Sequence, residues 1–130
     1  MLLLLLCLSP LLALSRSASE GVYTKQQATR GQSLYLEECA KCHGENLSGG
    51  DGAPELSGAE FLGRWNGKSL AGIFSLINKT MPTDDPGHLS TRQSADLLAF
   101  ILSSNSFPAG EKDLENNTEA LNEIRIDTKK

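Results

Sequence analysis

Two cysteines and the histidine that follows them are the residues of this chain best suited to chemistry. They stand in the segment Cys39-Ala40-Lys41-Cys42-His43. At this spacing the two thiols lie about one helical turn apart, so they can add to the two vinyl groups along one edge of a porphyrin. The next residue, His43, can then bind the iron through a ring nitrogen. The spacing therefore predicts covalent attachment of one haem c.

Two other kinds of site use cysteines at this spacing. A redox-active dithiol belongs next to a βαβ pattern, which this sequence lacks, and it has no need of the adjacent histidine. A structural zinc ion needs four ligands, and outside residues 1–19 the chain offers only Cys39, Cys42, His43 and His88. Two of these are sequence neighbours, which makes joint coordination of one ion awkward. We therefore favour the haem over the dithiol and the zinc site.

The second axial ligand of the iron has two candidates downstream, Met81 and His88. A lone methionine is usually packed in a core, but Met81 follows an amphipathic segment, precedes a proline and is the only methionine outside the first 19 residues. We expect Met81 to bind the iron and His88 to lie in a surface turn. A thioether favours ferrous iron and fills the sixth position, so this ligand pair predicts electron transfer at a fairly high potential rather than catalysis.

Two further residues are candidates for the haem site. A carbonyl of the loop around Pro54 could accept the second ring N–H of His43 and fix the plane of the imidazole. The alternative is an ordinary turn proline. Trp65 could line the haem crevice or donate its indole N–H to a propionate, and packing as a simple core side chain explains it equally well.

The elements that position these residues are helices. The first is predicted over residues 25–41, with Thr24 as its N-cap and Gln27 reaching back to complete a capping box. Glycine, proline, serine and asparagine are frequent over residues 44–67, which predicts a loop there.

Two more helices follow the loop. One is predicted to begin after Lys68 or Ser69 and to end before Met81, because its apolar residues recur at helical spacing. The other opens with a capping box from Ser90 to Gln93 and runs to about residue 103. The residues expected to face inward are Ala28, Gly31, Tyr35 and Cys39 on the first helix, Leu70, Ile73, Phe74 and Ile77 on the second, and Leu97, Leu98, Ile101 and Phe100 on the third.

Composition limits the fold and the partners. The chain has 130 residues, enough for one small domain, and 12 Lys and Arg against 16 Asp and Glu. It has no basic run before Lys129-Lys130, so no nucleic-acid partner is expected. The supply of core side chains outside residues 2–14 is thin, which indicates that a cofactor fills part of the interior. We expect an all-α fold of three to four helices packed around one covalently bound haem.

Residues 1–19 are expected to form a signal peptide. The apolar stretch over residues 2–14 is too short to span a bilayer, and small residues follow it between Ser15 and Ser19, where we expect cleavage. An uncleaved anchor is the alternative, since no basic residue precedes the stretch. The haem domain is expected over residues 20–110. The tail over residues 111–130 has only Leu114, Leu121, Ile124 and Ile126 as anchors, which predicts that it wraps loosely or frays.

Between about Thr24 and Phe107 the chain resembles the class I monohaem cytochromes c of bacterial type. The resemblance rests on Gly31-x-x-x-Tyr35, the Cys39–His43 motif followed by Gly44, Pro54-Glu55-Leu56, Met81-Pro82 and the helical segment over residues 97–102. It implies that the first and last helices cross near Gly31, Tyr35, Leu97 and Phe100. It also implies that the Pro54 carbonyl accepts from the proximal histidine.

Several stretches look more narrowly like the small cytochromes that accompany quinoprotein, PQQ-dependent dehydrogenases. They are Thr80-Met81-Pro82, residues 86–90, residues 105–110 and residues 121–126. This resemblance implies a periplasmic, monomeric single-electron carrier, not an enzyme, that accepts electrons from a quinoprotein dehydrogenase and passes them to a terminal oxidase. No stable membrane insertion is expected after processing.

Two alternatives remain open at the level of sequence. One is a haem enzyme or gas sensor with an open distal site. The other is a permanent haem subunit of a dehydrogenase complex, with residues 111–130 serving as the docking strap.

Overall fold

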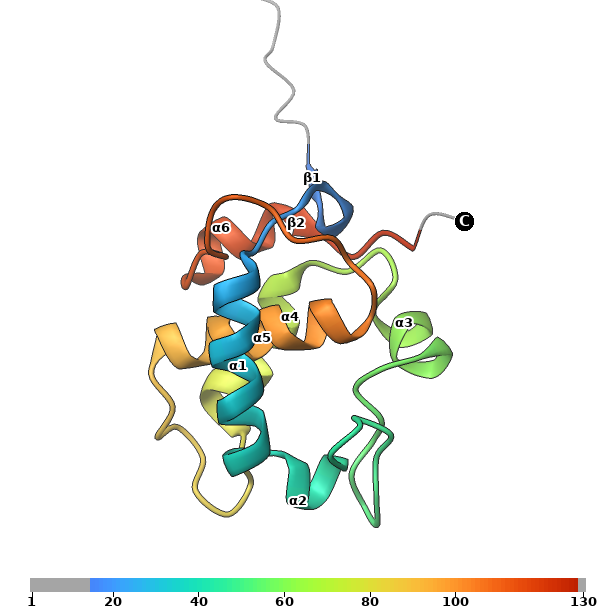
Figure 1. The fold of residues 1–130 in the computed structure, drawn as a ribbon, viewed down its shortest axis with the longest axis vertical. Coiled ribbons are helices and arrows are strands. Elements are labelled where there is room, and N and C mark those ends of the chain that lie inside the picture. Colours follow the sequence, from blue (N-terminus) through green and yellow to red (C-terminus); the bar gives the residue numbers. More distant parts are fainter. Residues whose placement is uncertain (1–14, 129–130) are drawn as a thin grey trace, which may run out of the picture.

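Helices dominate the computed structural model, which describes residues 15–128. One short pair of strands joins the two ends of this region. The all-α fold expected from the sequence is confirmed (Figure 1). In chain order the elements are β1 (Arg16–Ser17), the 3-10 helix η1 (Ala18–Glu20), α1 (Lys25–Glu38), α2 (Ala40–His43), α3 (Ala59–Trp65), α4 (Leu70–Thr80), α5 (Thr91–Ser104), α6 (Thr118–Asn122) and β2 (Ile124–Arg125).

Helices α1 and α5 cross in contact with one another at Gly31 (Figure 1). A Cβ atom on Gly31 would lie 1.9 Å from the carbonyl oxygen of Asp96, so only glycine permits this approach. One turn further along, the rings of Tyr35 and Phe100 pack with their centroids 5.2 Å apart. The crossing implied by the family resemblance is therefore present, with Leu97 buried beside it.

The helix starts follow their capping residues. Ser90 accepts from the backbone N–H of Gln93 while the Gln93 side chain accepts from the N–H of Ser90, so the predicted capping box of α5 is confirmed. Thr24 caps α1 as predicted, accepting from the N–H of Gln27. The predicted bond from the Gln27 side chain back to Thr24 is wrong, because the Gln27 amide instead binds the backbone of Leu114.

Helix α4 has the predicted bounds and the predicted buried face. It buries Leu70, Ile73, Phe74 and Ile77 and ends at Thr80, with Met81 in extended conformation directly after it. The first helix is shorter than predicted: α1 ends at Glu38, and the chain departs from helical angles at Cys39 before α2 begins. Helix α3 lies inside the segment predicted to be a loop.

The tail is part of the folded domain. Helix α6 and strand β2 pack against α4, and β2 pairs in parallel with β1. All four predicted anchors are buried: Leu114, Leu121, Ile124 and Ile126. The expectation of a loose or fraying tail is therefore wrong over residues 111–128, because these side chains complete a core that α4 alone leaves open.

The predicted signal peptide falls mostly outside the described residues. Residues 1–14 lie there, whereas residues 15–19 are described and belong to β1 and η1. The division into residues 1–19, 20–110 and 111–130 stays a prediction. Over residues 15–128 no helix has both the length and the apolar character needed to cross a membrane.

We expect Gly31→Ala to destabilise the protein, because the added methyl must separate α1 from α5. Overpacking of this kind costs about 1–3 kcal/mol. Gly63→Ala in α3 is the matched control, since its Cβ would meet nothing within 4 Å and alanine favours a helix. Denaturant unfolding of the two variants measures the difference. Equal midpoints for Gly31→Ala and the parent would contradict the account of the crossing.

Candidate functional site

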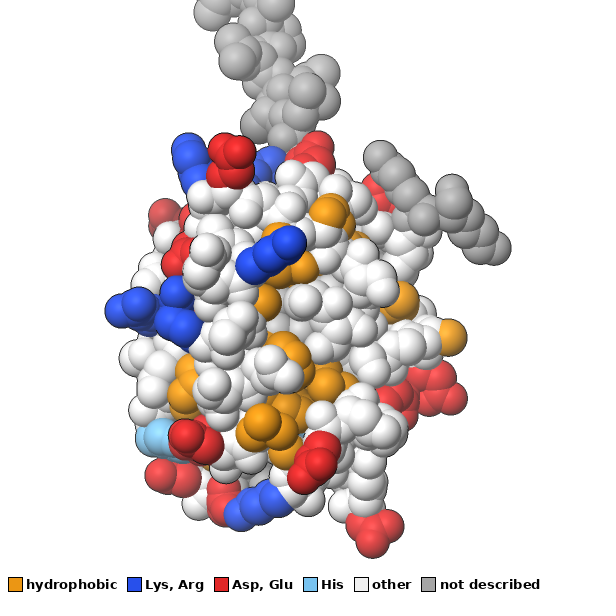
Figure 2. Space-filling view, viewed as in Figure 1, with side chains coloured by type: hydrophobic (Ala, Val, Ile, Leu, Met, Phe, Trp, Pro, Cys, Tyr) orange, Lys and Arg blue, Asp and Glu red, His pale blue; other side chains and the backbone are white. Residues whose placement is uncertain are grey.

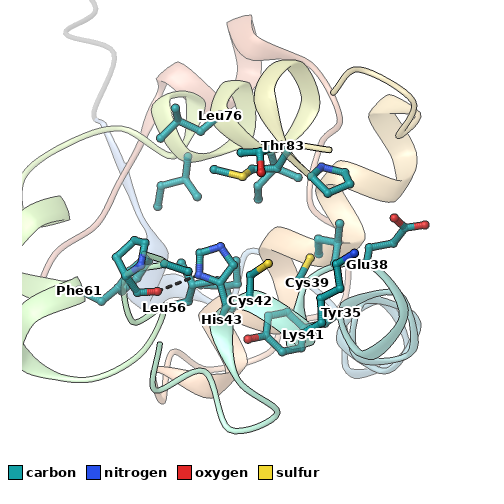
Figure 3. A pocket seen from close by; sticks show the side chains of 18 of the residues that line it. Tyr35, Glu38, Cys39, Lys41, Cys42, His43, Leu56, Phe61, Leu76 and Thr83 are labelled. Carbon is teal, nitrogen blue, oxygen red and sulfur yellow. Dashed lines mark hydrogen bonds between the residues drawn. The ribbon is translucent and has the colours of Figure 1, made fainter. Parts of the chain in front are cut away.

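A cavity of about 570 Å³ opens between α2 and α4, a volume in the range of small-molecule and cofactor sites. Its walls are mainly apolar, and every helix from α1 to α5 contributes to them. Cys39, Cys42 and His43 lie on one wall, and Leu76 and Thr83 lie across from them (Figure 3). The other apolar residues of the walls are Tyr35, Ala53, Pro54, Leu56, Phe61, Trp65, Ile73, Ile77, Met81, Pro82, Leu97 and Ile101.

The two cysteines are free and line the same wall. Cys39 is half-buried at the break between α1 and α2, and Cys42 is exposed in the last turn of α2. Burial, followed by the nearby charges of Glu38 and Cys42, raises the pKa of the Cys39 thiol to about 11. Cys39 is thus a neutral thiol at physiological pH, in an apolar setting. The pair can present two sulfur atoms to one edge of a flat apolar group.

His43 is oriented by the loop that follows it. Its Nδ1 lies 2.8 Å from the carbonyl oxygen of Pro54, as the dashed line in Figure 3 marks. Because a carbonyl only accepts, Nδ1 carries the proton and Nε2 keeps a free lone pair. The loop is held by a bond from the Gly49 N–H to the His43 carbonyl of 2.7 Å. Gly50 lies so close that a Cβ there would come within 2.8 Å of the Cys42 carbonyl.

Tyr35 supports the same wall from α1. Its hydroxyl donates to the carbonyl oxygen of Gly44 at 2.6 Å, which ties the end of α2 to the first helix. Desolvation, with a smaller contribution from Cys39, raises the pKa of Tyr35 to about 12. The hydroxyl therefore stays protonated and can serve as this donor.

Met81 lines the cavity from the segment that follows α4, together with Pro82 and Thr83. It is half-buried. The structure thus brings Met81 into the cavity that holds the Cys39–His43 motif, although 37 residues separate it from that motif. His88 is not among the residues that line this cavity.

Helix α3 adds Trp65 and Arg64 to the cavity wall. Trp65 is half-buried, packs against Gly72 of α4 and has the ammonium of Lys68 5.5 Å from its ring centroid. Trp65 lines the cavity and also packs against the hydrophobic core, so its role at the haem stays a prediction. Arg64 was missed by the sequence analysis, because its place depends on α3, a helix that the glycine-rich composition concealed.

Two ion pairs connect the segment after Met81 to the cysteine motif. Lys41 Nζ lies 2.9 Å from Asp84 Oδ2, and His88 Nε2 lies 3.2 Å from Glu38 Oε2. His88 is also held by the Asp85 carbonyl, 2.8 Å from its Nδ1, and its side chain is 34% exposed. It is a surface turn residue, as expected, and it fastens the Met81 segment to the end of α1.

The cavity suits a flat, largely apolar group with iron at its centre. It offers two thiols and a pre-oriented imidazole on one wall and a thioether in the same cavity. The zinc alternative needs four ligands. Between residues 15 and 128 no three His, Cys, Asp or Glu side chains gather as a metal-binding group. A cavity of this size has no role in a structural zinc site either.

Comparison with known proteins gives two matches. The family model described as "Cytochrome C oxidase, cbb3-type, subunit III" matches residues 26–101. Among solved structures, a chain of the sulfane dehydrogenase SoxCD from Paracoccus pantotrophus shares the fold, with a TM-score of 0.54 at 19% identity. The match covers 84% of this chain and 62% of that chain, so our chain corresponds to under two thirds of its length. A search of curated proteins gave no match.

We expect the His88–Glu38 pair to make stability depend on pH. The Asp85 carbonyl, followed by the Glu38 side chain, raises the pKa of His88 above its ordinary value of about 6.5. A raised pKa means that the stabilisation is fully present below about pH 6.5 and is lost as the pH rises through the folded-state pKa.

Thermal midpoints between about pH 5.5 and 8.5 test this by comparing the parent with His88→Gln. The difference between the two should shrink as the pH rises. His88 forms its pairs with Glu38 and Asp85. Lys41→Gln, which breaks the neighbouring pair with Asp84, is the control and should leave this pH dependence in place. A difference that is constant across the range would refute the assignment.

Proposed function

Because the chain belongs to the cytochrome c family matched by the cbb3-type oxidase subunit III model, we propose that it is an exported carrier of single electrons. It is a class I monohaem cytochrome c, and its haem c is covalently bound. The haem supplies a one-electron ferric/ferrous couple, and the chain supplies attachment, axial ligands and a water-poor setting.

The proposed attachment residues are Cys39 and Cys42, with His43 as the proximal ligand. The observation that carries this proposal is the 2.8 Å contact between His43 Nδ1 and the Pro54 carbonyl. It leaves Nε2 as the only ring nitrogen free to bind iron, and it fixes the orientation of the imidazole ring. The position of both thiols on the same cavity wall supports the assignment.

Met81 is the proposed distal ligand. It lines the cavity at the end of α4, and Lys41–Asp84 and His88–Glu38 hold the segment after it against the wall that carries the motif. With an imidazole and a thioether on the iron, no coordination position is left for a substrate. This supports a carrier rather than a haem enzyme or gas sensor with an open distal site.

Trp65 and Arg64 are proposed to face the polar edge of the group. Both line the cavity, and an indole N–H and a guanidinium are donors that suit carboxylates. Arg64 is already near the Glu55 carboxylate, at 3.6 Å, and donates to the Glu55 carbonyl at 2.9 Å. It can bind a further anion with its remaining N–H groups.

The proposed partners are a periplasmic quinoprotein dehydrogenase as donor and a terminal oxidase as acceptor. The acidic character of the face that carries the cavity suggests that these partners contact it through a basic surface. Hydrophobic side chains gather on the lower half of this face, and acidic side chains stand around them (Figure 2). Three carboxylates, Glu38, Asp51 and Asp84, line the cavity against two cations, Lys41 and Arg64, so the acidic groups are in excess there.

The burial of the tail argues against the alternative in which residues 111–130 serve as a docking strap. Its large apolar side chains are buried in the chain's own core, so they are not free to hold a second protein. The proposal therefore describes a monomeric carrier that meets its partners in turn.

We expect Met81→Ala to lower the reduction potential and to let carbon monoxide bind the ferrous protein, because the iron loses its thioether. Leu76→Ala is the matched control: it removes a large side chain from the same cavity wall but no ligand. Redox titration and a visible spectrum under carbon monoxide measure both effects. If Met81→Ala and Leu76→Ala behave alike, Met81 is not the ligand.

We also expect the cavity face to favour cationic oxidants. Oxidation of the reduced protein by the cationic tris(phenanthroline)cobalt(III) should slow as salt is added, and oxidation by ferricyanide should accelerate, because salt screens the acidic side chains. Asp51→Asn should reduce the rate with the cationic oxidant by about threefold or more at low salt. Glu119→Gln on α6, at the opposite end of the molecule from α2 (Figure 1), is the charge-matched control and should leave it unchanged. Equal effects of the two variants would contradict the proposed docking face.

A further inference from the structure

Three overlapping triplets with small residues at both ends follow the apolar stretch at the N-terminus. They are Ala13-Leu14-Ser15, Ser15-Arg16-Ser17 and Ser17-Ala18-Ser19. A leader peptidase cleaves after a triplet of this kind. The sequence therefore leaves three possible first residues for the processed chain, namely Arg16, Ala18 and Glu20, and it does not choose between them.

The structure gives residues 16 and 17 a defined place in the fold. They form β1, which pairs with Ile124 and Arg125 of β2. The backbone N–H of Arg16 donates to the Glu123 carbonyl at 2.8 Å, and its guanidinium lies 2.7 Å from the Glu115 carboxylate. Both contacts join Arg16 to the C-terminal tail, across about a hundred residues of sequence.

The next two residues are held as firmly. Ala18 is fully buried in the core. Ser17 and Glu20 form a complete capping box around η1, and the Ser19 hydroxyl donates to the Asp127 carbonyl at 3.2 Å. A chain that began at Ala18 would lack β1 and the Ser17 cap, and a chain that began at Glu20 would also lack the buried Ala18. Only a start at Arg16 keeps all of these contacts.

The part of the tail that these residues cover is itself core. Leu121, Ile124 and Ile126 are fully buried. Without β1, the edge of β2 would be exposed. Without Ala18 as well, an unfilled space would remain in the core. Losing residues 16–19 would therefore weaken the packing that fastens the tail to α4.

We propose that the chain is processed at the Ser15–Arg16 peptide bond. The inference rests on the proposed export of the chain. Water, acting through the leader peptidase of the export machinery, hydrolyses this bond and leaves a carboxylate on Ser15 and an ammonium on Arg16. The ammonium keeps the hydrogen bond to the Glu123 carbonyl, because it donates as the amide N–H did, now with charge assistance. Both residues beside the bond are exposed.

The direct test is the N-terminus of the exported protein. The full chain is produced in a bacterial host that attaches haem c, and the periplasmic product is analysed by intact mass and N-terminal sequencing. The expected first residue is Arg16. A first residue of Ala18 or Glu20, or a chain that keeps residues 1–15, overturns the proposal.

Two variants separate the two triplets that contain Ser15 from the third triplet, and N-terminal sequencing of the parent distinguishes a start at Arg16 from one at Ala18. Ser15→Tyr places a bulky residue directly before the proposed bond and should stop cleavage there. Ser19→Tyr does the same for a start at Glu20 and should leave Arg16 as the first residue. Cleavage that survives Ser15→Tyr but fails in Ser19→Tyr overturns the proposal.

The structural reason is tested with two chains exported behind an unrelated leader, one beginning at Arg16 and the other at Glu20. We expect the unfolding equilibrium constant of the haem-loaded Glu20 chain to be at least tenfold larger. Equal constants would remove the reason for choosing Arg16. The visible spectrum of the product from the direct test, processed from the full chain, reports separately on the electron carrier: a colourless product that begins at Arg16 would refute the proposed function alone, and a haem-containing product that begins at Glu20 would refute the processing site alone.

Discussion

The crossing of α1 and α5 is the constraint on which the rest of the structure depends. The backbones meet at Gly31 and Asp96 with no space for a side chain between them. This contact fixes the direction of α1, and α1 leads straight into the segment that carries Cys39 and Cys42. On the other side of the contact, α5 turns Leu97 and Ile101 into the cavity. The contact between the two helices therefore sets the position of the cysteine wall relative to Leu97 and Ile101.

The same crossing holds the C-terminal tail. The Asp96 carboxylate is buried and accepts two hydrogen bonds from Arg30, at 3.1 and 3.2 Å, and Arg30 also reaches Asp113 at 2.7 Å. Gln27, one turn earlier and 2% exposed, binds both the N–H and the carbonyl of Leu114. A buried amide whose groups are all paired is costly to open, since each group left unpaired loses its compensation for desolvation. The tail is thus fastened to the first helix by polar contacts and to α4 by apolar ones.

Local signals were enough to predict much of this arrangement, and long-range contacts account for what was missed. The cap at Ser90 and the bounds of α4 depend on residues within one or two turns, and both were correct. The Gln27 side chain binds Leu114, nearly ninety positions away, and the tail is held by contacts with distant parts of the chain. The predictions for both were wrong. The break at Cys39 was invisible because no glycine or proline marks it. At the site, spacing alone located His43, whereas Arg64 required the position of α3.

Helix α4 lies between the cavity and the C-terminal tail. The tail therefore helps to hold the wall of the cavity that carries Met81. The cavity takes side chains from α1 to α5, and α6, β1 and β2 contribute none of those that line it. Ile126, the residue directly after β2, instead binds the turn before α4, through bonds of 2.8 Å from the Gly67 N–H to the Ile126 carbonyl and 2.9 Å from the Ile126 N–H to the Lys68 carbonyl. The tail thus fixes the beginning of α4 independently of the cavity, and the rigid helix carries that restraint to its other end. Met81, the first residue after α4, is therefore positioned by contacts made at the far side of the molecule.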